Sequence, residues 1–96
     1  MSKTITGLDQ QVTFIDGTPV GATVGRVLAN SVARGVHSEA ALATDIALRL
    51  LKAEKEITLD KMEFGIVQQC VTQDQTTANF AKTRMLAALD DAKAEK

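Results

Sequence analysis

The chain has 96 residues, with 11 lysine and arginine residues against 12 aspartate and glutamate residues and a formal net charge of −1. This length predicts one domain that buries roughly 65% of the surface of its extended chain, and this charge excludes a global positive field that would hold a polyanion or an anionic membrane. Hydrophobic residues make up 45% of the chain and aromatic residues 3%, so aliphatic side chains must fill the core, which favours closely packed helices.

Residues 1–20 differ from the rest of the chain, because β-branched residues dominate there and favour short strands. Asp16-Gly17 lies between two such stretches, Val12–Ile15 and Thr18–Val20. An Asp-Gly pair is typical of a type I′ turn, in which both residues have positive φ, so we expect a β-hairpin. Pro19 donates no backbone hydrogen bond, which predicts that the returning strand lies at an edge.

Apolar residues recur at helical spacing in four segments of the remaining chain. Thr23 is the expected N-cap of the first helix, and Gly35 is its expected left-handed C-cap. Ser38 and Thr58 are the expected N-caps of the second and third helices. The predicted helices cover residues 23–34, 39–55, 59–72 and 77–92.

The helix over residues 39–55 is apolar on most of its circumference, so we expect it to bury side chains such as Leu48 and Leu51 on more than one side. In the third helix Met62 falls on the predicted buried line. Gly65 indicates either close packing against another backbone or a local weak point. After Leu89 the chain has little to bury, so its last turn should fray.

These elements predict a mainly α fold in one domain, residues 1–96. A short N-terminal β-hairpin precedes a compact bundle of about four helices arranged around residues 39–55.

The sequence contains no catalytic, cofactor-binding or metal-binding signature. His37 adjoins Ser38, but adjacent residues rarely face each other, and no third group is indicated to orient the imidazole ring. Cys70 falls on the apolar line of its helix, where a cysteine behaves as a small buried hydrophobe. The acidic residues do not cluster at metal-ligand spacing. We therefore predict that the protein is not an enzyme and holds no cofactor or metal.

The segment between Gly17 and Ser38 contains no acidic residue. It places Arg26, Arg34 and His37 on or beside the first helix, where they could contact a phosphate backbone. Two arginines are a small footprint, however, and the chain has no Trp or Tyr to stack on bases. A solvated helix face is the favoured interpretation, and nucleic-acid contact is the alternative.

Three motifs in the chain are Ile15-Asp16-Gly17-Thr18-Pro19-Val20, Thr23-Val24-Gly25-Arg26-Val27-Leu28-Ala29-Asn30 and Glu56-Ile57-Thr58-Leu59. They resemble the D-G-x-P-hydrophobic turn, the T-L-G-D-V-L-like helix start and the E-L-T-x-E-E helix start of a group of small proteins from tailed-phage and prophage genomes. The resemblance spans about residues 14–89, and Arg26 and Asp60-Lys61 stand where that group carries acidic residues. It implies a phage accessory or assembly-related protein in the bacterial cytoplasm, with no activity attached to any residue.

We expect the protein to act through protein–protein interaction or self-association. The hairpin around Phe14, Asp16, Gly17 and Val20 could bind a host or phage protein along its edge, and aliphatic faces outside the core could be buried in a homo-oligomer. The single cysteine and the lack of a long apolar segment predict a cytoplasmic protein with no membrane partner. The alternative is a small nucleic-acid-binding regulator that uses Arg26, Arg34 and His37.

Overall fold

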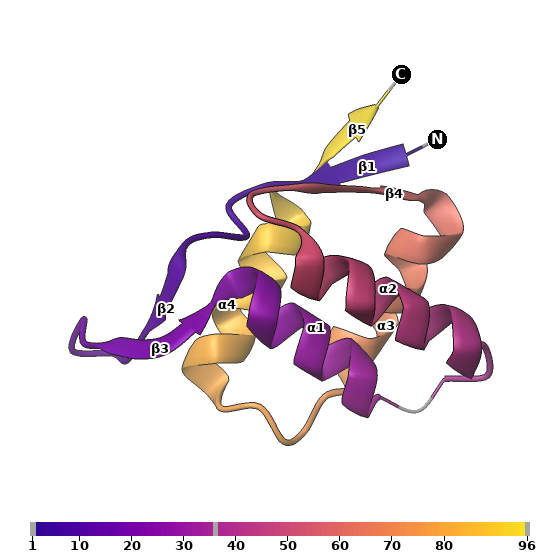
Figure 1. Ribbon diagram of the computed structural model, residues 1–96. Helices are drawn as coiled ribbons and strands as arrows, with labels where there is room; N and C mark the ends of the chain where they lie inside the picture. The colour runs from indigo at the N-terminus through magenta and orange to yellow at the C-terminus, as the bar shows by residue number, and fades with distance from the viewer. Residues whose placement is uncertain (1, 36, 96) are drawn as a thin grey trace.

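The computed structural model describes residues 2–35 and 37–95, which form four helices and five strands (Figure 1). The helices are α1 (Val24–Arg34), α2 (Ala40–Lys52), α3 (Lys61–Gln73) and α4 (Asn79–Asp90). The strands are β1 (Ser2–Ile5), β2 (Gln11–Thr13), β3 (Pro19–Thr23), β4 (Ile57–Asp60) and β5 (Lys93–Glu95). The predicted fold is confirmed: four helices and a short N-terminal hairpin, β2–β3, form a compact globule.

The core is mainly aliphatic, as the scarcity of aromatic residues required, and Phe64 is its one aromatic side chain among the described residues. Helix α1 contacts all three other helices and buries Val24, Leu28 and Val32 at four-residue spacing, which is the pattern of a helix with one apolar face. Complete burial of one such side chain contributes about 1.5–3 kcal/mol relative to exposure. The remaining fully buried large side chains are Ile5, Leu8, Val12, Ile46, Leu50, Leu59, Val67, Val71 and Met85.

The ends of α1 and α2 agree with the sequence only in part. Thr23 caps α1 as predicted, because its Oγ1 accepts a hydrogen bond from the Arg26 N–H at 3.3 Å. Gly35 is not left-handed: it has φ −66° and ψ 156°, and its N–H donates to the carbonyls of Ser31 and Val32. The N-cap of α2 is Glu39 rather than Ser38, and α2 ends at Lys52 rather than at residue 55.

The largest departure from the predicted elements is strand β4, in a stretch that we predicted to begin a helix. It pairs antiparallel with β1, which also pairs with β5, so the strand order is β4-β1-β5. Ile57 and Leu59 are buried while Thr58 is exposed, which is the two-residue period of a strand with one face inward. Instead of capping a helix, Thr58 makes a hydrogen bond at 2.9 Å between its Oγ1 and that of Thr4 in β1.

Helix α3 therefore starts at Lys61, not at residue 59, and its N-cap is Asp60. The Asp60 carboxylate accepts from the Glu63 N–H at 2.7 Å, and the Glu63 carboxylate accepts from the Asp60 N–H at 3.0 Å, which is a capping box. Glu63 also forms an ion pair with Arg49 of α2. With this start Met62 falls outside the buried line, and it is 56% exposed.

The last helix covers Asn79–Asp90 rather than residues 77–92. The chain after it does not fray as predicted, because β5 pairs with β1 in the register Thr4↔Lys93 and Ser2↔Glu95. The two ends of the described chain thus lie side by side in one sheet (Figure 1).

Gly65 is a weak point of α3 and not a packing contact. A Cβ built on Gly65 meets no other described atom within 4 Å, and the residue is exposed. Gly65→Ala should therefore raise the free energy of unfolding by about 1 kcal/mol, the difference in helix propensity between the two residues. Urea denaturation at neutral pH measures this change, and a loss of stability would contradict the assignment of Gly65 to an open helix surface.

Candidate functional site

The hairpin β2–β3 projects from the helices and carries the predicted partner-binding residues (Figure 1). The Phe14 N–H donates to the Thr18 carbonyl at 2.8 Å, and the Gly17 N–H donates to the Phe14 carbonyl at 2.9 Å. Every positive φ in the described chain belongs to a glycine, and Gly17 has φ 89°. The predicted type I′ turn is therefore wrong: the loop has three residues and closes on a left-handed glycine.

The hairpin exposes a group of apolar side chains, Phe14, Ile15 and Val20, which we call the hairpin patch. Ile15 has a relative exposure of 101%, and Phe14 and Val20 are also exposed. The Phe14 ring rests against Phe80 of α4, with ring centroids 5.1 Å apart, which fixes the base of the loop on the helices. Of these three residues, our sequence prediction included Phe14 and Val20 and omitted Ile15.

Asp16 and Gly17, the other predicted residues of the hairpin, are also exposed. The Asp16 carboxylate accepts a hydrogen bond from the Thr18 N–H at 3.0 Å. This bond lowers the pKa of Asp16, so the residue beside Ile15 carries a negative charge at neutral pH. The tip of the hairpin is thus apolar with one anionic group.

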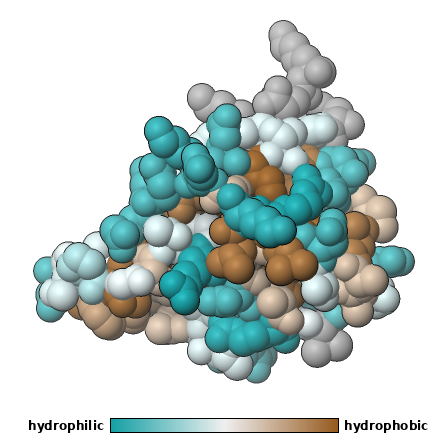
Figure 2. Space-filling view, in the orientation of Figure 1, coloured by the Kyte–Doolittle hydropathy of each residue, from teal (hydrophilic) through white to brown (hydrophobic). Residues whose placement is uncertain are grey.

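A second exposed apolar surface lies on α2. Leu48 and Leu51, which we predicted to be buried, are 51% and 56% exposed. We call these two residues the α2 patch. Hydrophobic surface is visible both along the hairpin and over the helices at the centre of the molecule (Figure 2). Because α2 buries Ala43, Ile46, Ala47 and Leu50 on its other side, it has an apolar face left over.

The residues predicted for nucleic-acid contact have different surroundings. Arg34 donates to Thr77 Oγ1 at 2.8 Å and lies 3.7 Å from the Asp74 carboxylate. His37 bonds through Nε2 to Gln69, and its Nδ1 accepts from the Glu39 N–H at 3.0 Å. Arg26 is exposed on the first turn of α1. Two of the three side chains are thus bound within the molecule, and nucleic-acid contact stays a prediction.

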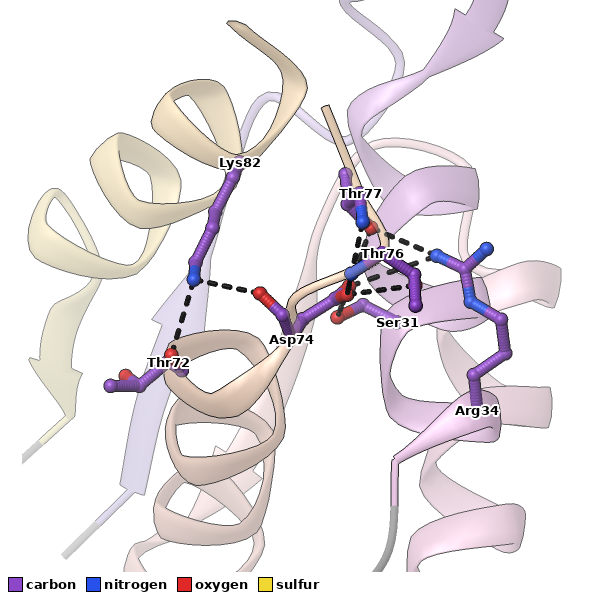
Figure 3. Close-up of polar contacts among 7 residues, drawn as sticks. All are labelled: Ser31, Arg34, Thr72, Asp74, Thr76, Thr77 and Lys82. Carbon is purple, nitrogen blue, oxygen red and sulfur yellow. Dashed lines mark hydrogen bonds and ion pairs between the residues drawn. The ribbon is translucent and has the colours of Figure 1, made fainter. Parts of the chain in front are cut away.

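Sequence reasoning missed the densest polar cluster in the described chain, which surrounds Asp74 between α3 and α4 (Figure 3). Its carboxylate accepts hydrogen bonds from the hydroxyls of Ser31, Thr76 and Thr77 and from the N–H groups of Thr76 and Thr77. Lys82 of α4 donates to the carbonyls of Thr72 at 3.2 Å and of Asp74 at 2.8 Å, at the carbonyl end of α3. The Asp74 cluster consists of Ser31, Arg34, Thr72, Asp74, Thr76, Thr77 and Lys82.

The hydrogen bonds of the Asp74 cluster support a structural role for it. Burial by itself would raise the pKa of Asp74, but the hydrogen bonds from Thr77, Ser31 and the two backbone N–H groups outweigh burial and hold the pKa well below its usual range. A carboxylate with a low pKa and five donors is a poor proton acceptor. The cluster ties the end of α3 and the following loop to α1.

A groove of about 310 Å³ lies beside this cluster, between the ends of α1 and α3. Gly35 and Cys70 form part of its wall. Burial raises the pKa of the Cys70 thiol, which disfavours the reactive thiolate. In the described residues, no group of three or more His, Cys, Asp or Glu side chains could hold a metal ion, and no helix is long and apolar enough to span a membrane.

No family model, curated protein or solved structure matches this chain. Its function is therefore inferred from the geometry of the exposed surfaces described above.

Proposed function

We propose that this protein is a non-enzymatic accessory protein, of the tailed-phage kind that its sequence resembles, and that it binds protein through the hairpin patch. The observation that carries the proposal is the complete exposure of Ile15 at the tip of a projecting hairpin, beside exposed Phe14 and Val20. Clustered apolar side chains on a surface are typical of interaction sites, since they gain free energy when a partner covers them.

The non-enzymatic part of the proposal is supported by the state of the reactive groups. Asp74 is saturated with hydrogen bonds, Cys70 is buried, and both ring nitrogens of His37 are in hydrogen-bond contact. The localisation that fits this proposal is the bacterial cytoplasm, where a phage accessory protein would meet host and phage proteins.

Ile15→Asp should weaken partner binding strongly and leave the fold intact, because Ile15 is fully exposed. Loss of a central apolar anchor costs about 2 kcal/mol, or about thirtyfold in affinity. The measurement is capture from lysates of infected or lysogenic cells on the tagged protein, with every retained protein quantified against the same bait.

Met62→Asp is the matched control, since it places the same charge on an exposed apolar position of α3. The proposal expects wild type and Met62→Asp to retain the same proteins and Ile15→Asp to lose them. Equal retention by all three baits would show that the hairpin patch is not the binding surface. Thermal unfolding of each bait checks that the fold is unchanged.

A further inference from the structure

We propose that the hairpin patch of one copy docks on the α2 patch of a second copy, so that the protein associates head to tail. The inference rests on the proposed function and names its partner. Seven large hydrophobic side chains are exposed in the described chain, and five of them belong to the two patches: Phe14, Ile15, Val20, Leu48 and Leu51. One chain thus presents two apolar surfaces that could cover each other.

The two patches cannot meet within one copy. The hairpin packs against α1 through β3 and against α4 through β2, and its tip points away from the body that contains α2 (Figure 1). Ile15, Leu48 and Leu51 all remain exposed in this arrangement. A contact between the patches must therefore join two molecules.

One charge beside each patch, Asp16 on the hairpin and Lys52 on α2, has the opposite sign to the other. Residues 4–25 contain only two charged side chains, Asp9 and Asp16, and both are acidic. On α2, the exposed Lys52 lies one turn after Leu48, and the exposed Asp45 lies one turn before it. Docking with Asp16 near Lys52 and away from Asp45 joins opposite charges, which sets the direction of the hairpin along α2.

A contact between two different patches leaves one patch unused on each terminal copy. Such heterologous contacts form a closed ring or an open chain, depending on the rotation between neighbours. Few side chains take part, so the contact is smaller than a standard stable interface, and we expect self-association at about 10–1,000 μM.

Mixing two defective variants tests this contact directly. Ile15→Asp disables the hairpin patch and keeps the α2 patch, whereas the double variant Leu48→Asp/Leu51→Asp does the reverse. Each alone should sediment as a monomer at concentrations where wild type and Met62→Asp associate. An equimolar mixture should form a heterodimer and no larger assembly. The intact hairpin patch of the double variant can dock on the intact α2 patch of Ile15→Asp, and no further intact patch is left in that pair.

The inference would be overturned if wild type stayed monomeric up to about 1 mM, or if the mixture of the two defective variants stayed monomeric. It would also be overturned if either defective variant alone associated as strongly as wild type, because that would indicate contact between like patches. If wild type is monomeric but Ile15→Asp still loses a different captured protein, the head-to-tail contact is wrong and the proposed function stands.

A charge exchange gives a second readout that does not depend on the apolar substitutions. Asp16→Lys and Lys52→Glu should each weaken self-association about threefold at low salt, as exposed charge pairs do. Their mixture should restore it, because each contact between the two different variants then joins one acidic and one basic side chain. Equal association by the single variants and by their mixture would overturn the assigned direction.

Discussion

Asp74→Ala should lower the free energy of unfolding by about 3 kcal/mol, because it removes a nearly buried carboxylate that accepts the hydrogen bonds of the cluster. The Asp74 side chain is only 5% exposed, and its loss leaves the Ser31 hydroxyl and the N–H groups of Thr76 and Thr77 without their acceptor. It also removes the ion-pair partner of Arg34. Urea denaturation at pH 7 measures the effect.

Asp90→Ala is the control for this prediction, since Asp90 is an exposed acid at the end of α4. We expect it to change stability by less than about 0.5 kcal/mol. A loss for Asp74→Ala no larger than that of Asp90→Ala would contradict the structural role of the cluster.

The contribution of Asp74 to the free energy of unfolding should decrease at acidic pH. Because hydrogen bonds hold its pKa in the folded state below the usual value, its stabilisation is complete above the pKa of an unfolded aspartate, which is about 4. It decreases as the pH falls through the lower pKa of the folded state. The stability difference between wild type and Asp74→Asn should therefore be constant from about pH 5 to 8 and shrink below about pH 4. A difference that grows on acidification would contradict the lowered pKa.

Gly25→Ala should destabilise the protein by about 1–3 kcal/mol, although alanine is the better helix former. A Cβ on Gly25 would lie 3.2 Å from the Leu8 Cβ and 3.3 Å from the Leu8 carbonyl oxygen. Leu8 cannot withdraw easily, because its carbonyl accepts from the Gly25 N–H at 3.0 Å and its N–H donates to the Lys55 carbonyl at 2.9 Å. The helix start and the preceding loop are therefore in close contact here.

Gly65→Ala is the matched control, since both residues are glycines inside helices and differ in what surrounds them. The expected effects have opposite signs, and thermal or urea unfolding of the two variants compares them directly. A stabilising Gly25→Ala would mean that Leu8 and its loop can move aside.

The helices were predictable because their burial repeats locally, as at Val24, Leu28 and Val32. Strand β4 was not predictable from local sequence, since Thr58 and Asp60 both resemble helix N-caps. The residue that pairs with Thr58 in the sheet is Thr4, which is far away in the sequence. The signal that could have corrected the start of α3 was present in the sequence: Asp60 and Glu63 have the spacing of a capping box.

The hairpin patch was predicted only in part, because the predicted loop was one residue too short. A two-residue turn would have left Ile15 in a strand, whereas the observed three-residue loop puts it at the tip. The exposure of Leu48 and Leu51 depends on which side of α2 the neighbouring helices cover, which periodicity cannot decide. The Asp74 cluster depends on Ser31 lying beside the polar loop after α3, a contact between residues far apart in the sequence.

The most direct test of the hairpin as a surface that binds a second copy of this protein is a residue-resolved dilution series by NMR of the amide groups. We predict that the signals of residues 14–20 and 44–52 shift together with concentration and give one dissociation constant, while those of the Asp74 cluster do not move. Spectra that are unchanged from about 10 μM to about 1 mM would contradict head-to-tail association. Shifts confined to surfaces other than the hairpin would contradict the claim that copies of this protein associate through the hairpin patch.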